Sequence, residues 1–398
     1  MLNVKYMEHK FESVKELVRQ TELNLKTVDR ENLPISDELV KMKGGGWRLK
    51  LVESPLVQKL MYLMNVDYYK HRFSKSFTSY IKSEMALYMT ESEMADEKNV
   101  ARIIKDIRRC EKMIQAKPYE YFFLNLRNLT DKERKTFVTD KYMLQKMSMT
   151  GARRLHDVEL NEKYNFYLLA KPFFKREVVL LNKDSHYEEF EKVALSLGKM
   201  IFKPTSLGCG GGVFVAEVDT PEKVKQEFDK VVSDGGTWVA EELIKQTAEM
   251  ASWNQTSVNT MRVLSFSTED EIKFTTCFLR TGRNGAVVDN GGAGGVFAAV
   301  DDETGIVISD GNDEKAKSYA CHPDSKQVFK GWQVPRWDEL KETAAALHST
   351  VFPYMKYIGW DFALTDQGWV VIEGNWGQFL QQAATGVGLR PVFDKYVK

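Results

Sequence analysis

Hydrophobic residues recur every three or four positions along the first part of the chain. Val14, Leu17 and Val18 follow this spacing, and so do the apolar residues between positions 100 and 107, which lie among charged side chains. This period places the apolar residues on one face of a helix. The pattern predicts a mainly helical N-terminal region over residues 1–130.

Beyond residue 131 the texture changes to short apolar runs of strand length. Candidate strands cover residues 166–169, 178–181, 200–202, 213–218, 238–240, 260–266, 272–279, 298–300, 306–308, 357–364 and 369–373. Helices are predicted from Pro221, which follows the capping residue Thr220, and over residues 337–351. This mixture is typical of an α+β fold with antiparallel strands. We expect it to divide into parts at 131–245 and 246–398.

The last two candidate strands carry the strongest chemical signal. A three-residue loop containing Gly368 would connect them as a hairpin and set Asp361 directly across from Glu373. Glu373 and Asn375 are two positions apart on a strand, so their side chains share a face. Two carboxylates on one face repel each other unless a cation joins them, and carboxylate and amide oxygens suit Mg²⁺. A solvated hairpin is the alternative, but apolar residues flank both acids.

A glycine-rich loop forms the second signal. It follows Lys203, connects two candidate strands, and includes Gly208, Gly210, Gly211 and Gly212. Glycine permits positive φ angles and close backbone approach, so such a loop can place N–H groups against phosphate oxygens. The chain lacks the G-x-x-x-x-G-K-[ST] sequence, and a strand rather than a helix follows the glycines, which excludes the dinucleotide-binding fingerprint. A glycine-rich hairpin without function is the alternative.

Further candidates lie on neighbouring strands. Glu241, Glu242 and Ile244 end an apolar strand and are suited to contact an adenine edge and a ribose, although an ordinary strand end is an equally good interpretation. Arg262 and Arg280 lie inside strand-like runs, where a buried guanidinium needs an anion. That anion is either a phosphate or substrate carboxylate, or an acid in a structural ion pair. The sequence favours a structural role for His322 over that of a general base.

Composition limits the partners. Lysine plus arginine and aspartate plus glutamate number 56 each, so no net field favours nucleic acid. The four cysteines form no C-x-x-C pair, which suits a reducing compartment. We find neither a signal-peptide pattern nor an apolar run of membrane-spanning length, and expect a cytoplasmic protein with no membrane span and a possible homodimer contact.

Together these motifs resemble the ATP-grasp superfamily, which includes the D-alanine–D-alanine ligases. The match to the sugar-transfer-associated ATP-grasp family covers roughly residues 120–390. It rests on residues 121–123, 129–133, 257–262, 289–295, 322–323 and 359–361, together with the carboxylate hairpin. The resemblance implies an ATP-grasp fold, in which two α+β subdomains grip ATP. Trp360 precedes the metal aspartate, whereas those ligases carry an arginine two positions before it.

The resemblance also assigns roles. It implies that Asp361, Glu373 and Asn375 hold magnesium, with two ions expected and Mn²⁺ able to substitute, and that Lys203 and the lysine of the Asp140-Lys141 pair contact ATP phosphates. The segment 241–244 is similar to the adenine hinge, and Glu249 to the ribose-binding acid. Arg262, Arg280 and Lys203 are then the expected catalytic residues.

The implied activity is that of an ATP-dependent carboxylate–amine ligase acting through an acylphosphate. The expected acceptor is a small molecule or a saccharide, and one plausible product is the amide of a uronate in a polysaccharide precursor. A kinase on the same fold, which would phosphorylate a hydroxyl, is the first alternative. A non-catalytic ATP-binding regulator is the second, although the intact metal triad speaks against it. The 291–295 loop is expected to close over substrate.

Overall fold

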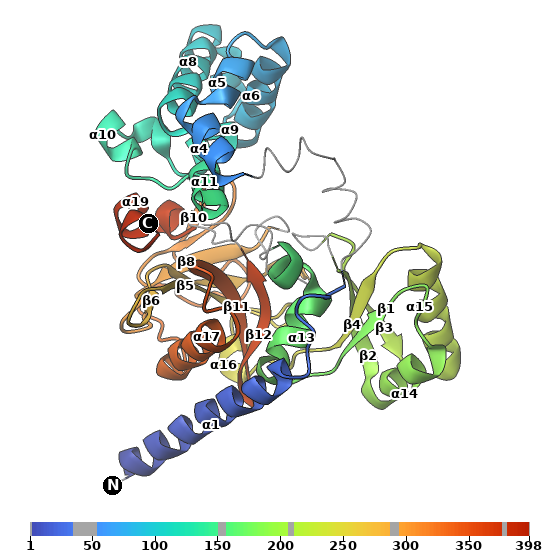
Figure 1. Cartoon of the computed structure of the whole chain (residues 1–398). Coiled ribbons are helices and arrows are strands. Elements are labelled where there is room, and N and C mark those ends of the chain that lie inside the picture. The colour runs from blue at the N-terminus through green and yellow to red at the C-terminus, as the bar shows by residue number, and fades with distance from the viewer. Residues whose placement is uncertain are drawn as a thin grey trace.

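The computed structural model describes residues 2–34, 54–149, 157–205, 211–286, 294–375 and 380–397. The helices of its first half are α1 (Leu2–Leu25), α4 (Pro55–Leu63), α5 (Val66–His71), α6 (Lys75–Tyr88), α7 (Glu91–Ala95), α8 (Glu97–Ile114), α9 (Pro118–Phe123), α10 (Asp131–Arg134), α11 (Asp140–Met149) and α13 (Lys163–Phe174). Figure 1 shows α4 to α10 grouped at one end of the molecule, while α1 lies at the opposite end, against α13. The N-terminal region is therefore helical, as predicted, but its first helix packs against α13 in the later part of the chain.

Local signals explain where these helices begin and which face they bury. Thr90 begins α7 with a capping box, in which its hydroxyl accepts from the Glu93 N–H and the Glu93 carboxylate accepts from the Thr90 N–H. Asp96 caps α8 without such a box: its carboxylate accepts from the N–H groups of Lys98 and Asn99. Val100 and Ile107 on α8 are buried, as the helical spacing requires.

A four-stranded antiparallel sheet follows. Its strands are β1 (Val178–Leu181), β2 (Gly198–Pro204), β3 (Phe214–Val218) and β4 (Trp238–Glu242), in the order β1-β4-β2-β3, with α14 (Tyr187–Leu197) and α15 (Pro221–Ser233) packed against it. The Thr220 hydroxyl accepts from the Lys223 N–H, and Pro221 lies in the first turn, as predicted. We call this unit the small sheet.

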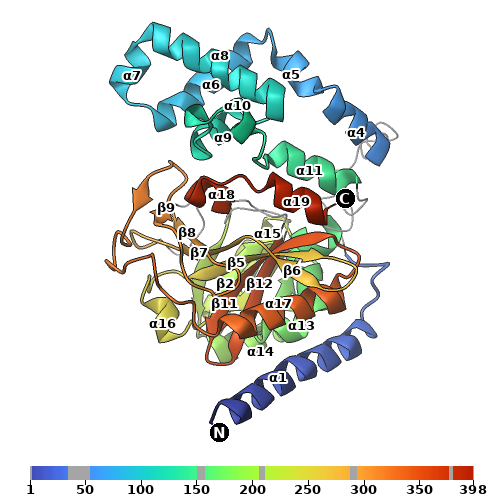
Figure 2. The same ribbon diagram turned by 90° about the vertical axis from the view of Figure 1, so that its left-hand side faces the viewer.

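The larger sheet is formed by β5 (Thr260–Ser267), β6 (Ile272–Phe274), β7 (Cys277–Thr281), β8 (Val296–Val300), β9 (Gly311–Asn312), β10 (Ser318–Tyr319), β11 (Tyr357–Thr365) and β12 (Gly368–Asn375). The strand order is β10-β9-β8-β7-β5-β11-β12, and β6 pairs with β5. The remaining helices are α16 (Ala248–Ala251), α17 (Trp337–Val351), α18 (Leu380–Thr385) and α19 (Arg390–Tyr396). In Figure 2, α13 and α17 lie below this sheet, and α11, α18 and α19 lie above it.

Three strand predictions were wrong. Residues 166–169 belong to α13. Phe166, Leu169 and Phe173 recur at helical spacing and are all buried. Over only four apolar residues, this pattern cannot be distinguished from that of a buried strand. The segment 272–279 is divided between β6 and β7, and residues 306–308 form only isolated bridges to neighbouring segments. The division of the chain at 130/131 and 245/246 stays a prediction. Among the residues described, no helix is both long and apolar enough to cross a membrane.

Candidate nucleotide and metal site

The hairpin of β11 and β12 sets the first half of the site. Asp361 lies directly opposite Glu373, as predicted, but the chain reaches this register by another route. Thr365 pairs with Gly368, so the turn has two residues rather than three, and an irregularity after Asp361 restores the offset. Gly368 has φ of +100°, which explains why glycine occupies this position.

Strand register also brings two arginines to Asp361. Arg262 on β5 is the cross-strand partner of Asp361 on the side away from Glu373, and Arg280 on β7 is opposite Thr260, two positions from Arg262. Residues two apart on a strand share a face, so the guanidinium groups and the carboxylates meet on one side of the sheet.

The contacts are those of a buried ion pair. Arg262 donates through Nε to Oδ1 of Asp361 and through Nη2 to Oδ2 at 2.7 Å, and Arg280 Nη1 donates to Oδ2 at 2.9 Å. Burial would raise the pKa of Asp361, but the two guanidinium groups outweigh it and hold the pKa well below its ordinary value. The anion that the sequence required for these arginines is therefore Asp361. Nη1 of Arg262 is buried and has no hydrogen-bond partner among the described residues, so it can receive a further anion.

The donor set of Glu373 and Asn375 fits Mg²⁺. Burial and the facing Asp361 carboxylate raise the pKa of Glu373, which shows that its negative charge is incompletely compensated. Asn375 donates through Nδ2 to Oε1 of Glu373 at 2.7 Å, which leaves its carbonyl oxygen for a cation. Hard oxygen ligands of this kind suit Mg²⁺. Asp361 can join them only by sharing its oxygens with the arginines. Within the described residues no group of three or more His, Cys, Asp or Glu side chains is arranged for a metal.

The small sheet supplies the second half of the site. Lys203 Nζ on β2 lies 2.9 Å from Oε1 of Glu241 on β4, and Arg176 Nη2 lies 2.8 Å from Oε2. Burial would raise the pKa of Glu241, yet Lys203 and Arg176 lower it to about 2. Arg176 Nη1 also donates to the Val371 carbonyl on β12 at 2.7 Å, so this triad joins the two sheets. Because both of its carboxylate oxygens are bound by these cations, Glu241 connects the two sheets and is not free to accept a hydrogen bond from a ribose hydroxyl.

Lys163 is a residue that the sequence reasoning missed. It opens α13, and its Nζ donates to the Pro204 carbonyl at 2.9 Å and to the Thr205 carbonyl at 3.4 Å, where β2 enters the glycine-rich loop. Burial lowers its pKa, while the charge of Glu373 opposes that shift and the charge of Lys203 adds to it. Lys163 therefore lies between the two halves of the site. No sequence pattern marks it, because its neighbours come from distant segments.

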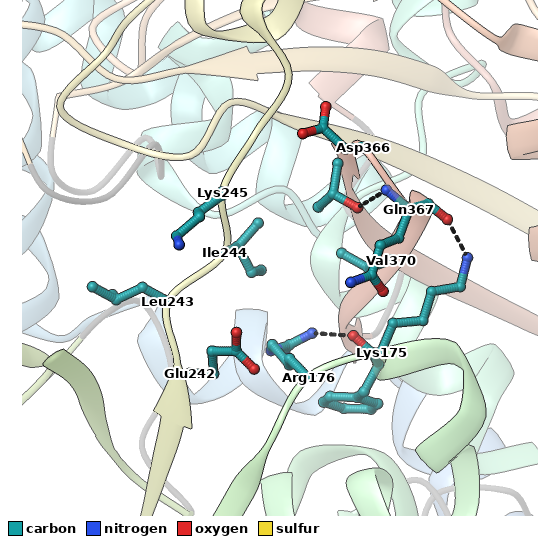
Figure 3. Close-up of a pocket in the computed structure, with 11 residues that line it drawn as sticks. Lys175, Arg176, Glu242, Leu243, Ile244, Lys245, Asp366, Gln367 and Val370 are labelled. Atoms are coloured by element: carbon teal, nitrogen blue, oxygen red, sulfur yellow. Dashed lines mark hydrogen bonds between the residues drawn. The ribbon is translucent and has the colours of Figure 1, made fainter. Parts of the chain in front are cut away.

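A pocket of about 230 Å³, which we call the hinge pocket, lies beside the ion pairs of Glu241 and includes Arg176 in its lining. The strand end Glu242–Lys245 forms one wall, Lys175 and Arg176 form another, and the hairpin turn at Asp366 and Gln367 forms a third (Figure 3). Lys175 Nζ donates to the Gln367 carbonyl at 2.9 Å and fixes that turn. Glu242 and Ile244, predicted as parts of an adenine hinge, both line the pocket.

Several predicted residues lie elsewhere. Lys141 on α11 forms an ion pair with Asp67 on α5, so the contacts that the structure shows for it are with the N-terminal helices. Glu249 is exposed in the first turn of α16 and does not line the hinge pocket. Gly208, Gly210 and residues 291–293 of the loop predicted to close over substrate (291–295) fall outside the described residues, so the closure stays a prediction. Gly212 has φ of +73°, and a Cβ there would lie 2.9 Å from Cγ of Pro204, so the position requires glycine.

The contacts of His322 favour a structural role over that of a general base. The side chain is fully buried, its Nε2 lies 2.9 Å from the Gly282 carbonyl, and its Nδ1 lies 3.2 Å from the N–H groups of Asp324 and Ser325. Nε2 must then carry the proton and Nδ1 must accept, so both ring nitrogens are engaged in holding loops together.

Comparison with known proteins assigns the family. The chain belongs to the sugar-transfer associated ATP-grasp family, whose model matches residues 177–397, more than half of its length. This confirms the family predicted from the sequence. A search of curated proteins found no match.

Solved structures that are similar to part of the chain include ligases and synthetases. D-alanyl-alanine synthetase A from Vibrio cholerae is 10% identical, with 60% of each chain covered and a TM-score of 0.36. The ATP complex of D-alanine–D-alanine ligase from Bacillus anthracis is 13% identical, with 60% of this chain and 65% of that chain covered and a TM-score of 0.36. D-cycloserine synthetase DcsG is 11% identical, with 71% and 82% covered and a TM-score of 0.37. The chain thus spans less than two thirds of the length of the first two.

Proposed function

We propose that this protein is an ATP-dependent carboxylate–amine ligase acting through an acylphosphate. The observation that carries the proposal is the row of buried and partly buried charges between the two sheets. Lys203 and Lys163 lie at the mouth of the glycine-rich loop, and the Asp361–Glu373 pair with its arginines lies on the facing sheet. A polyphosphate chain with its metal is the ligand whose charges match this row.

Each part of the row has a role in the reaction. The hinge pocket receives adenine, and the lysines neutralise the β- and γ-phosphates. Glu373, Asn375 and a shared Asp361 hold the magnesium, which supplies charge neutralisation on the transferred phosphoryl group when bound. Two ions, with Mn²⁺ as a substitute, remain the expectation. Arg262 offers its unpartnered Nη1 to the same phosphate.

The chemistry then proceeds in two displacements. A substrate carboxylate oxygen attacks the γ-phosphorus, the bond to the β-γ bridging oxygen breaks, and ADP leaves. The amine nitrogen attacks the acylphosphate carbonyl, the C–O bond to phosphate breaks, and the nitrogen loses a proton. Both steps depend mainly on positioning and charge neutralisation. A uronate or a related saccharide acid is the carboxylate we propose, a choice supported only by the association with sugar transfer in the family description.

Release of ADP and of phosphate, measured separately, tests this proposal. Mg²⁺-ATP is offered with uronic acids alone, with amines alone, and with pairs of the two, and Glu373→Gln serves as the inactive variant. Glu269→Gln, an exposed acid remote from the site, is the matched control. Phosphate release that requires both substrates and is lost only in Glu373→Gln supports a ligase. ADP formation with a phosphorylated hydroxyl acceptor and no free phosphate would instead show a kinase and refute the proposal.

A further inference from the structure

A second cavity, of about 420 Å³, lies where the N-terminal helices meet the large sheet. Its walls come from α6, α9, the start of α11, the loop before β10, and α18. In Figure 2 these elements lie where the N-terminal helices, at the top, meet the large sheet below them. The cavity shares no lining residue with the hinge pocket. The ATP site described above leaves it unexplained.

The lining combines apolar and aromatic surface with negative charge. Tyr88, Tyr119 and Phe123 contribute aromatic rings, and Leu124, Val138 and Leu380 contribute aliphatic surface. The charged side chains that line it are Glu84, Glu120, Asp140 and Glu314, and none of the lining residues is basic.

The charges in the cavity are only partly compensated. Asp140 is satisfied by Lys117 Nζ at 2.8 Å and by the Tyr119 hydroxyl at 2.6 Å. Glu120, by contrast, is 3% exposed, and within the described part of the chain it accepts from the backbone N–H groups of Lys117 and Asp140. Burial and the charge of Asp140 raise the pKa of Glu120 to about 8. Glu120 is therefore largely protonated at neutral pH, and a cation that enters the cavity would favour its charged form.

The cavity also adjoins the proposed reaction centre. Phe123 in the cavity wall packs against Phe297, with the ring centroids 5.9 Å apart, and Phe297 is the cross-strand partner of Arg280, which binds Asp361 in the candidate site. A ligand that packs against the aromatic wall is therefore separated from the strand that carries Arg280 by one layer of side chains.

Resting on the proposed ligase function, we propose that this cavity is the binding site of the amine substrate, and that it takes a primary ammonium group attached to a compact, partly apolar skeleton. The carboxylates bind the ammonium, and the tyrosine and phenylalanine rings pack against the hydrocarbon part and add cation–π attraction. The N-terminal helices thereby contribute specificity for the acceptor.

Direct binding of simple amines to the full chain tests the proposal without turnover. Isothermal titration uses 1,4-diaminobutane and ethanolamine as probes, with acetate and glycerol as the anionic and uncharged comparisons. The variants are Glu84→Gln and Glu314→Gln, which change partly exposed side chains at the edge of the cavity and leave buried Glu120 intact. Glu269→Gln is the control. We expect each cavity variant to weaken binding of the amine on the order of tenfold, and to leave ATP binding unchanged.

The outcomes separate this inference from the ligase proposal. Equal amine affinity in the wild type and both cavity variants, or no amine binding by folded protein, overturns the amine site. If ADP and phosphate release with an amine persists and neither variant raises the KM for that amine, the ligase proposal stands and the cavity assignment is wrong. If amines bind in the cavity but never trigger phosphate release, the cavity assignment stands and the ligase proposal is wrong.

Discussion

The two facing carboxylates of the candidate metal site should respond oppositely to neutralisation. Asp361→Asn removes the only carboxylate that the structure shows bound to both Arg262 and Arg280, among the residues described. Glu373→Gln removes the carboxylate that faces Asp361 and keeps the shape of the side chain. We expect Asp361→Asn to destabilise the protein strongly and Glu373→Gln to leave its stability unchanged or raise it.

The magnitude follows from burial. The side chains of Asp361 and Arg262 are 4% and 3% exposed, and that of Arg280 is 10% exposed. Removing one partner of such a buried pair leaves cations uncompensated and costs about 3–5 kcal/mol. For Glu373 the sign differs, because burial and the charge of Asp361 already raise its pKa, so loss of its charge removes a repulsion.

Urea unfolding followed by tryptophan fluorescence measures both effects. The chain has eight tryptophans, several of them buried, so the fluorescence change follows unfolding of the chain as a whole. In parallel, Mg²⁺-dependent ADP release should be lost in both variants. Loss of activity in Glu373→Gln at normal stability then identifies a role in binding metal or phosphate, whereas loss in Asp361→Asn by itself does not.

The reasoning is refuted if Asp361→Asn changes the free energy of unfolding by less than about 1 kcal/mol, which is well below the cost of a broken buried pair. It is refuted equally if Glu373→Gln destabilises the protein as much as Asp361→Asn does. Exposed Glu269→Gln provides the baseline for an unrelated change of one charge.

Three further outcomes are expected. Lys163→Met should weaken the binding of a non-hydrolysable ATP analogue by more than about tenfold in calorimetry. Lys141→Met should change this affinity little, because Lys141 is paired with Asp67. Equal effects of the two substitutions would contradict the assignment of Lys163 to the ATP site. Gly212→Ala should cost about 1–2 kcal/mol in thermal unfolding, since its φ is +73°; an unchanged transition would argue against this strain. Burial lowers the pKa of His348 to about 4, so between pH 6.5 and 4 the unfolded state binds the extra proton. His348 should therefore contribute a loss of about 3 kcal/mol in stability over this range, and His348→Gln should remove that contribution from the measured pH dependence.

Much of the fold was predictable because local signals and tertiary packing agree. The Thr220–Pro221 helix start and the helix over 337–351 were confirmed, because capping residues and apolar spacing act within a few residues of each other. The strand predicted at 166–169 was wrong for the complementary reason. A four-residue apolar run has no distinguishable period, and burial on all sides suits a helix as well as a strand.

The sequence by itself determined the chemistry of the carboxylate hairpin. Strand alternation and one glycine turn are local, so the facing positions of Asp361 and Glu373 could be predicted, although the structure reaches this pairing through a two-residue turn and an irregularity after Asp361 that the spacing did not predict. Only the tertiary structure decided which charges meet: that Asp361 binds two arginines, that Glu241 joins Lys203 to Arg176, and that Lys163 lies between the sheets. These contacts join segments tens to more than two hundred residues apart. Their energies depend on burial and on the relative placement of two sheets, which no local pattern encodes.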